Sequence, residues 1–335
     1  MTDNQPLTIE ISIIIPAYNA ADTIFACVRA LQTQTIPRGR YEIIVVDDGS
    51  ADDTAQRAAD AGARVIRQEN AGAAAARNRG AQAAQGEILL FTDSDCIPAP
   101  DWVAQMVAPF ADQSVTGAKG VYKTEQSGFT PRFVQQEYQD KYDGMAQLPQ
   151  IDFVDTYSAA YRRDIFLAMG GFDTNFPGAS VEDQEFSFRL AEAGYRLVFV
   201  PQAMVFHRHD PALTDYARRK FFIGYWKNLV VRRHPDKIAR DSHTPQVLKL
   251  QMAFAALGSG MFALAILFRR AWLAGASLAS WLALVFSGVP FYRKIWRRDP
   301  AVLAVAPVML VVRAVSLGAG FAWGWLKLTV SGRLE

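Results

Sequence analysis

The stretch Gly86–Cys96 constrains the fold of this chain more than any other. Ile88 to Phe91 form a fully apolar run that is too short for a helix and follows a glycine, which predicts a buried strand. Two carboxylates, Asp93 and Asp95, come directly after that strand. Ligands bind at the carboxyl ends of strands in open α/β sheets, and paired carboxylates there offer hard oxygen ligands to a divalent cation. An isolated Asp-x-Asp is better explained as a solvated acidic turn, so its meaning depends on the rest of the chain.

Strands and helices alternate before this stretch. Apolar runs bounded by turn residues predict strands, and segments with helical periodicity follow each of them. This order predicts an α/β domain with a mostly parallel, Rossmann-like sheet and right-handed crossovers. The predicted strands are 9–15, 41–46, 64–67 and 88–91, and the predicted helices are 22–34, 52–62 and 73–84.

Polar residues follow three of these strands and should meet at one edge of the sheet. Tyr18-Asn19, Asp47-Asp48 and Asp93-x-Asp95 all stand at carboxyl ends of predicted parallel strands. The first strand is not followed by G-x-G-x-x-G, and there is no Walker A sequence, which excludes the common dinucleotide and P-loop motifs. An aromatic ring, a carboxylate and a metal could still hold a nucleotide here. Arg77, on the alanine-rich helix, offers a permanent cation for phosphate, although a solvated helix arginine would look the same.

Further candidates lie in the second hundred residues. Gly170-Gly171 permits unusual backbone angles and close approach of a ligand. Glu182-Asp183 opens an amphipathic helix, where carboxylates are favoured by the helix dipole and are also well placed to act as a base. His207 follows an apolar run and is a candidate metal ligand, whereas His209 is interpreted as an ordinary core or surface residue.

Composition excludes several classes of protein. The formal net charge is only +2, so there is no electrostatic case for nucleic-acid binding. The two cysteines, Cys27 and Cys96, lack metal-ligand spacing and do not suggest a disulfide framework. The first ten residues are polar and do not resemble a cleavable signal peptide, so we expect the first domain to stay in the cytoplasm.

Six blocks of residues in this chain resemble the sequence motifs of glycosyltransferase family 2. The similarity covers roughly residues 8–209, and the motifs occur in the order and spacing of that family. The resemblance implies a GT-A fold, a nucleotide-diphospho-sugar donor, a divalent cation (Mn²⁺ or Mg²⁺) and inversion at the anomeric carbon. The matching blocks are Ser12–Asn19, Val45–Ser50, Ala75–Asn78, Phe91–Asp95, Gly170–Asp173 and Glu182-Asp183.

The resemblance also implies roles for individual residues. Asp183 would be the general base, and Asp95 would be the direct metal ligand, with His207 completing the metal shell. On the acceptor side the resemblance points to Gly171, Phe172 and Glu182. The remaining residues belong to the donor: Pro16 and Tyr18 would line the base pocket, Asp48 would accept a hydrogen bond from the base, Arg77 would lie near the diphosphate, and Asp93, with Ser94 beside it, would serve the ribose and the metal.

Two features refine the implied activity. Processive synthases of this family carry Gln-x-x-Arg-Trp after the late histidine, whereas this chain has Phe221–Trp226 without it, which favours transfer of single sugars. A phosphotransferase of the haloacid-dehalogenase type also places Asp-x-Asp after a strand, but Ile97 stands where that class needs Thr or Val. A membrane-anchored, non-catalytic scaffold of the same fold is the remaining alternative, and the presence of Asp93, Asp95 and Asp183 speaks against it.

The C-terminal third becomes far more apolar. We expect a glycosyltransferase domain at 1–212, a basic and aromatic interfacial helix or linker at 213–245, and a membrane domain at 246–335. Residues 247–268 and 271–291 are long enough to span a bilayer, and 301–326 is a third candidate span interrupted by Arg313. Such an anchor favours a lipid-linked or other membrane-associated glycan acceptor and a multi-pass protein of the inner (plasma) membrane. The positive-inside bias places residues 293–298 in the cytoplasm, and three spans would leave the C-terminus outside.

Overall fold

The computed structural model describes residues 9–176, 181–238, 241–242 and 244–331. The chain divides into two units. The first comprises residues 1–125 and 144–208, and the second comprises residues 126–143 and 209–335. The boundary at 212 stays a prediction; in the structure residues 126–143 are grouped with the C-terminal helices, which was not predicted from the sequence.

The first unit is built on one eight-stranded mixed sheet in the order β3-β2-β1-β4-β7-β6-β8-β5. The four N-terminal strands are parallel, as expected, while β7 runs antiparallel to both β4 and β6. The sheet therefore joins a parallel half to a mixed half at β4, the strand that precedes Asp93. The strands are β1 (Ile11–Ala17), β2 (Tyr41–Asp47), β3 (Arg64–Arg67), β4 (Ile88–Phe91), β5 (Ile97–Pro98), β6 (Val115–Lys123), β7 (Ala159–Arg162) and β8 (Arg196–Phe206).

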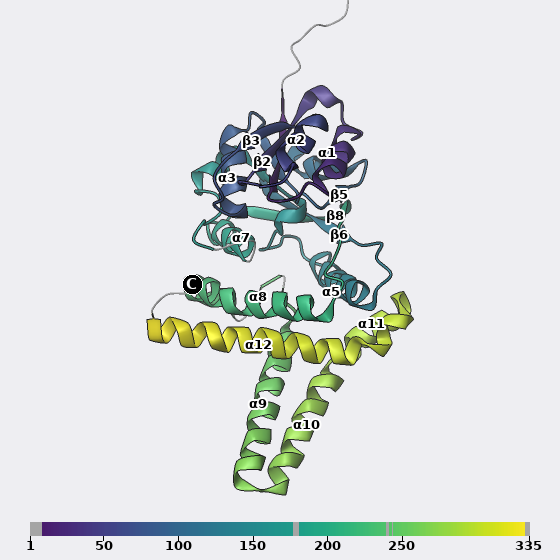
Figure 1. Cartoon of the computed structure of the whole chain (residues 1–335), viewed down its shortest axis with the longest axis vertical. Helices are drawn as coiled ribbons and strands as arrows, with labels where there is room; N and C mark the ends of the chain where they lie inside the picture. Colours follow the sequence, from purple (N-terminus) through teal and green to yellow (C-terminus); the bar gives the residue numbers. More distant parts are fainter. Residues whose placement is uncertain (1–8, 177–180, 239–240, 243, 332–335) are drawn as a thin grey trace, which may run out of the picture. The chain divides into compact units, whose positions relative to one another are not determined.

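Helices flank this sheet (Figure 1). Buried aromatic rings fill the space beside β4, where Phe166 and Phe186 lie 4.9 Å apart between ring centroids and Phe172 lies 5.6 Å from Phe91. The α-helices are α1 (Ile24–Gln32), α2 (Thr54–Asp60), α3 (Ala73–Ala83), α4 (Trp102–Val107), α6 (Arg163–Ala168) and α7 (Glu182–Glu192). Short 3₁₀ turns occupy 38–40, 108–111 and 156–158.

The first strand is longer than predicted. The sequence predicts that Pro16 ends the strand, but β1 continues to Ala17. The partner strand β4 pairs only as far as Ile14, whereas β2 pairs along the whole of β1. Pro16 therefore lies where β1 has a neighbour on one side only, and a strand tolerates a missing N–H at such a position.

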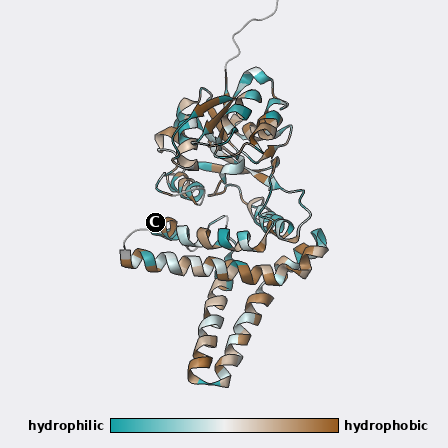
Figure 2. Ribbon diagram, in the orientation of Figure 1, coloured by the Kyte–Doolittle hydropathy of each residue, from teal (hydrophilic) through white to brown (hydrophobic). Residues whose placement is uncertain are grey.

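The second unit consists of helices: α5 (Phe129–Met145, which begins in this unit), α8 (Leu213–Arg233), α9 (Gln246–Phe268), α10 (Ala271–Ser287), α11 (Val289–Arg298) and α12 (Ala306–Ser331), with 3₁₀ turns at 235–238 and 300–304. By length and composition α9 and α12 could each cross a membrane. The predicted second span is instead two helices, α10 and α11, bent by 42°. Along the α9–α10 hairpin, Figure 2 shows polar colour at the tip, where Arg269 and Arg270 stand.

Candidate active site

The loops that follow β1 and β2 are bonded to each other. Asn19 N donates to Ser50 Oγ over 2.9 Å, and Ala51 N donates back to Asn19 Oδ1 over 2.9 Å. Asn19 adopts a left-handed backbone (φ 48°), which asparagine tolerates better than most residues. The side chain of Tyr18 beside it is 55% exposed, so its ring is free to stack on a planar ligand. Pro16 is buried within β1 and contributes backbone rather than an exposed ring face.

Asp48 is buried and organises the next loop. Its carboxylate accepts hydrogen bonds from Gln68 Nε2 (2.7 Å) and from the backbone N–H groups of Ala71 (2.9 Å) and Gly72 (2.8 Å). Asp48 therefore holds residues 68–72 at the start of α3. The hydrogen bond to a base that the resemblance implies for Asp48 stays a prediction.

Asp95 and His207 meet across the sheet edge. The Nε2 atom of His207 lies 3.1 Å from Asp95 Oδ2, although the two residues are 112 positions apart. The His207 backbone N–H donates to Lys123 O (2.9 Å), and its ring stacks on Tyr122 with centroids 4.7 Å apart. The imidazole is thus held in a fixed position beside an exposed carboxylate, as the two predicted metal ligands require.

The donor set suits a hard divalent cation. Asp95, Cys96 and His207 have candidate ligand atoms within 4.8 Å of one another. Burial, reinforced by Asp93 and Asp95, raises the pKa of the Cys96 thiol well above its usual value, so this thiol keeps its proton and is a poor ligand. What remains is carboxylate and imidazole, and carboxylate oxygens suit Mn²⁺ or Mg²⁺.

Arg77 is buried and ion-paired rather than solvated. Its side chain is only 2% exposed, and it donates from Nη2 to Asp93 Oδ1 (2.8 Å) and from Nη1 to Glu182 Oε1 (2.9 Å). Burial would lower the pKa of Arg77, but Asp93 and Glu182 outweigh burial and raise it. The alternative of a solvated helix arginine is therefore wrong. Arg77 is a buried bridge that ties the Asp-x-Asp loop to the N-terminus of α7.

Glu182 and Asp183 have separate environments, although they are adjacent. Glu182 is buried against Arg77 and does not offer a free carboxylate to an acceptor, which corrects the acceptor-side role expected for it. Asp183 is partly exposed. Burial and the negative charge of Glu182 raise the pKa of Asp183 to about 7, against the opposing charges of Arg77 and Lys119. A carboxylate with a pKa near 7 is suited to accepting a proton at neutral pH.

Gly171 and Phe172 shape the fold around this site. Gly171 has a left-handed backbone (φ 66°), and a Cβ atom there would collide with the Asn78 side chain. The Asn78 side chain also forms two hydrogen bonds with the backbone of Phe172: it accepts from Phe172 N (2.9 Å) and donates to Phe172 O (2.7 Å). The Phe172 ring is buried beside Phe91, so it cannot contact an acceptor. The expected acceptor-side role of Phe172 is corrected to one in the core.

No role was predicted from the sequence for Lys119, a residue of strand β6. It is completely buried on β6, donates from Nζ to Tyr157 Oη (3.0 Å) and is ion-paired with Asp155. It also lowers the pKa of Asp183. The available signal was a lysine in the middle of the otherwise uncharged run 115–122, where a charge must have a partner.

The chain is similar in sequence to known proteins. The family model described as Glycosyl transferase family 2 matches residues 12–170. The chain is 30% identical to Glycosyltransferase AglE of Haloferax volcanii over 234 residues, which cover 67% of this chain and 74% of the relative. It is 31% identical to the Pre-mycofactocin glycosyltransferase of Mycobacterium tuberculosis over 69% of this chain, but the match spans about half (49%) of that relative.

Solved structures share the fold. A mannosyltransferase from Pyrobaculum calidifontis, solved with GDP-Man and Mn²⁺, superposes with a TM-score of 0.61 at 19% identity and covers 96% of this chain and 90% of its own. Glucosyl-3-phosphoglycerate synthase from Mycobacterium tuberculosis, solved with Mn²⁺, UDP and glucosyl-3-phosphoglycerate, gives a TM-score of 0.50 at 25% identity over 66% of this chain and 79% of its own. The predicted GT-A fold is confirmed. From the family match and the Haloferax relative together, this chain belongs to glycosyltransferase family 2.

Proposed function

We propose that this protein is an inverting, metal-dependent glycosyltransferase that moves a sugar from a nucleotide-diphospho-sugar to a membrane-associated, lipid-linked acceptor. The observation that carries this proposal is the separation of two carboxylate environments in one unit. Asp95 lies exposed beside His207, whereas Asp183, whose pKa is raised to about 7, is not among the candidate metal ligands. One group would serve the departing diphosphate and the other would serve the incoming hydroxyl.

The donor would lie along the loops that follow β1, β2 and β4. Tyr18 would stack on the base, and the loop held by Asp48 would close the nucleoside site. Asp95 and His207, with Asp93 and Ser94 beside them, would hold the divalent cation. When bound, that cation neutralises the charge that develops on the leaving diphosphate. The relatives solved with Mn²⁺ and a nucleotide or nucleotide sugar support this arrangement.

Asp183 would act on the acceptor. As the acceptor oxygen bonds to the anomeric carbon, the bond from that carbon to the diphosphate oxygen breaks and the hydroxyl proton passes to Asp183. Attack from the face opposite the leaving group inverts the configuration. Glu182 and Arg77 position this base by fixing the first turn of α7.

The activity can be tested with the full-length protein in detergent. A panel of nucleotide sugars is supplied with Mn²⁺, with Mg²⁺ or with a chelator, and release of nucleoside diphosphate is measured. We expect release from one donor class, lost on chelation, and NMR of the product should show the inverted anomer. No release from any donor in the presence of a polyprenyl phosphate acceptor would favour the non-catalytic scaffold, and a retained configuration would exclude Asp183 as the base.

Replacing Asp95 should remove metal-dependent donor binding. We expect Asp95→Ala to abolish the Mn²⁺-dependent part of nucleoside diphosphate binding measured by calorimetry. Asp48→Ala should weaken nucleoside binding but keep its dependence on metal, because its contacts are with residues 68–72. Asp53→Ala, which removes an exposed carboxylate just before α2, is the matched control. Unchanged diphosphate affinity in Asp95→Ala would exclude the metal assignment.

The rate of transfer should depend on pH through Asp183. Its pKa is raised to about 7, so the carboxyl group is mostly protonated below that pH and cannot accept the acceptor proton. We expect kcat/KM to rise with pH and to level off above about pH 7, because kcat/KM reports groups of the free enzyme. A profile without an inflection between pH 6 and pH 8 would show that another group is the base.

A further inference from the structure

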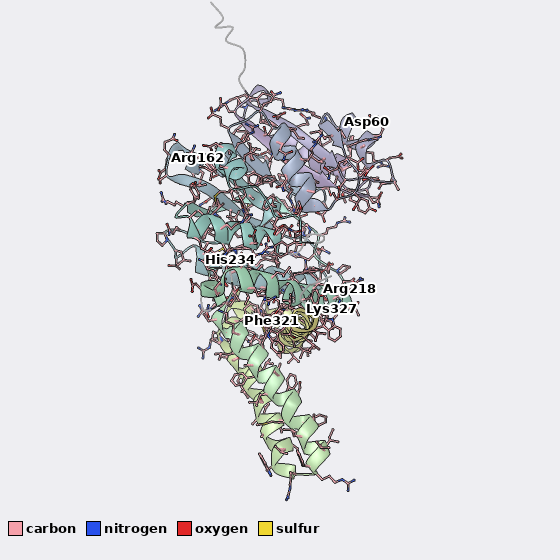
Figure 3. The ribbon with its side chains drawn as sticks, turned by 90° about the vertical axis from the view of Figure 1, so that its left-hand side faces the viewer. Asp60, Arg162, Arg218, His234, Phe321 and Lys327 are labelled. Carbon is pink, nitrogen blue, oxygen red and sulfur yellow. The ribbon has the colours of Figure 1, made fainter. Side chains whose placement is uncertain are left out.

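The last helix passes a simple test for a membrane span but has an unusual setting. The α12 helix has 26 residues and is apolar enough to cross a bilayer. Its direction nevertheless differs from that of the α9–α10 hairpin in the same unit: it runs across the end of the hairpin, and it is seen nearly end-on in the second view (Figures 1 and 3). The two arms of the hairpin are bonded to each other by Ser277 Oγ to Gly258 O (2.8 Å) and Ser280 Oγ to Phe254 O (2.9 Å).

Arg313 fixes α12 to its neighbours through a buried ion cluster. Arg313 is 8% exposed and donates from Nη1 to Glu137 Oε1 on α5 (2.8 Å) and from Nη2 to Gln251 Oε1 on α9 (2.7 Å). Lys220 Nζ of α8 lies 3.0 Å from Glu137 Oε2. Burial would raise the pKa of Glu137, but Lys220 and Arg313 outweigh it and lower the pKa to about 2. The charge of Arg313 is therefore paired within the protein.

The middle of α12 packs directly on the charged helix α8. Added Cβ atoms show how close the two backbones lie: one at Gly320 would collide with Phe221 O, and one at Gly324 would lie 2.6 Å from Tyr225 O. Asn228 Nδ2 also donates to Phe321 O (3.0 Å). The α8 helix carries Asp215, Arg218, Arg219, Lys220, Lys227, Arg232 and Arg233. If α12 crossed a bilayer, this contact would draw Lys220 and Lys227 into the hydrocarbon layer, which is strongly unfavourable.

The opposite face of α12 is apolar and uncovered. Among the residues of α12 that the structure describes, the exposed side chains recur at helical spacing and none is charged; Lys327 is only partly exposed, and Arg313, Gly320 and Gly324 lie on the other face. A face of this kind requires an apolar neighbour along its whole length. The exposed residues of this face are Val308 (59%), Val315 (41%), Trp323 (51%), Leu326 (46%) and Val330 (80%).

We propose that α12 lies in the membrane interface with this face toward the acyl chains, and that only the α9–α10 hairpin crosses the bilayer. The occupant of the face is the lipid surface, because α12 packs through Val311 and Ala314 against the α9–α10 hairpin, and that hairpin exposes large apolar side chains such as Leu257 and Phe286. Exposed Trp296 on α11 and Trp323 and Trp325 on α12 fit an interfacial position, where tryptophan is enriched. The last turn of α12 would then lie on the same side of the membrane as the catalytic unit.

The distribution of basic residues agrees with two spans. The hairpin tip carries Arg269 and Arg270, whereas the connection that follows α10 carries Arg293, Lys294, Arg297 and Arg298. Positive residues concentrate on the cytoplasmic side, so the tip lies outside and the connection inside. The three-span arrangement, with the C-terminus outside, is replaced by two spans and an interfacial helix.

Depth measurements on full-length protein in anionic phospholipid vesicles test this directly. Spin labels are attached to Val308→Cys, Val315→Cys and Val330→Cys, and their depth is measured from collisions with oxygen and with a water-soluble nickel chelate. The native cysteines are buried, and the unsubstituted chain is the labelling blank. We expect similar depths at all three positions. A helix that crosses would separate the first and last labels by about 33 Å at 1.5 Å per residue, and a depth difference of that order would overturn the proposal.

Two further arms separate packing from topology. A reporter fused after Glu335 should give a cytoplasmic signal, while Ala271→Cys at the hairpin tip should react with an impermeant maleimide added to intact cells; an external reporter signal would contradict the proposal. Gly320→Ala should lower the thermal unfolding temperature through its clash with α8, whereas Gly318→Ala, whose Cβ meets nothing, should not. Equal stability of these two variants would show that the contact with α8 does not hold α12 in place and would overturn the proposal.

Discussion

Replacing Asp183 with asparagine should reduce sugar transfer by roughly 10²–10⁴-fold, the range typical of a lost general base. The variant keeps the shape of the side chain and loses only the capacity to accept a proton. Because burial already raises the pKa of Asp183 to about 7, the fold tolerates a neutral group there, and the unfolding temperature should change little. Steady-state transfer with saturating donor and calorimetry of donor binding measure the two effects separately.

The neighbouring carboxylate provides the control for this experiment. Glu182→Gln should lose less activity, because Glu182 contacts Arg77 rather than the acceptor and glutamine can still accept that hydrogen bond. Donor affinity should be normal in Asp183→Asn, since Asp183 is not a candidate metal ligand. Near-normal transfer by Asp183→Asn, or a greater loss in Glu182→Gln, would move the base to another residue.

Removing the charge of Arg77 should strongly lower the free energy of unfolding. Arg77→Met leaves Glu182 buried and Asp93 partly buried without their shared cation, and breaking a buried ion pair in this way typically costs about 3–5 kcal/mol. Thermal and denaturant unfolding of the full-length protein in detergent would measure it. Activity should also fall, because the Asp-x-Asp loop and the first turn of α7 lose their connection.

The same helix offers a matched control. Arg79→Met, two residues further along α3, removes an exposed arginine and should leave stability within experimental error. Adding Glu182→Gln to Arg77→Met should recover part of the lost stability, because one uncompensated buried charge disappears. If Arg77→Met and Arg79→Met were equally stable, the buried bridge would contribute nothing to the fold.

The parallel half of the sheet was predictable because its signals are local. The runs 41–46 and 88–91 are short and mostly apolar, 64–67 places Val65 and Ile66 between two arginines, and each forms a strand at nearly those positions. The position of Asp95 at a strand end followed from the same pattern. Pro16 was the exception. Whether a strand continues through a proline depends on where the neighbouring strands stop pairing, and the sequence of one strand does not contain that information.

The partners of the charged residues could not be predicted. Arg77 and Glu182 are 105 residues apart, and only the tertiary fold makes one the counter-ion of the other. The position of Phe172 was not predictable either. The family resemblance implied that it faces an acceptor, whereas its ring packs in the core. From the sequence, Arg313 was interpreted as a charge that interrupts a membrane span. Hydropathy considers the residues of one helix only, so it could not include the partner of Arg313, Glu137, which lies on another helix.

The pairing of Glu137 with Arg313 also bears on how the protein is made. The two residues are separated by 176 positions, so at 5–20 residues per second a ribosome needs roughly 9–35 s to deliver the arginine after the glutamate has emerged. During this interval Glu137 can pair with Lys220 once α8 has been made, but α5 lacks Arg313 and the apolar residues of α11 and α12 that cover Phe133 and Val134. A nascent chain truncated before residue 313 would therefore expose part of the apolar surface of α5. Biogenesis should depend on holding that helix until the end of translation, and soluble fragments ending near residue 212 should aggregate unless residues 126–143 are also redesigned.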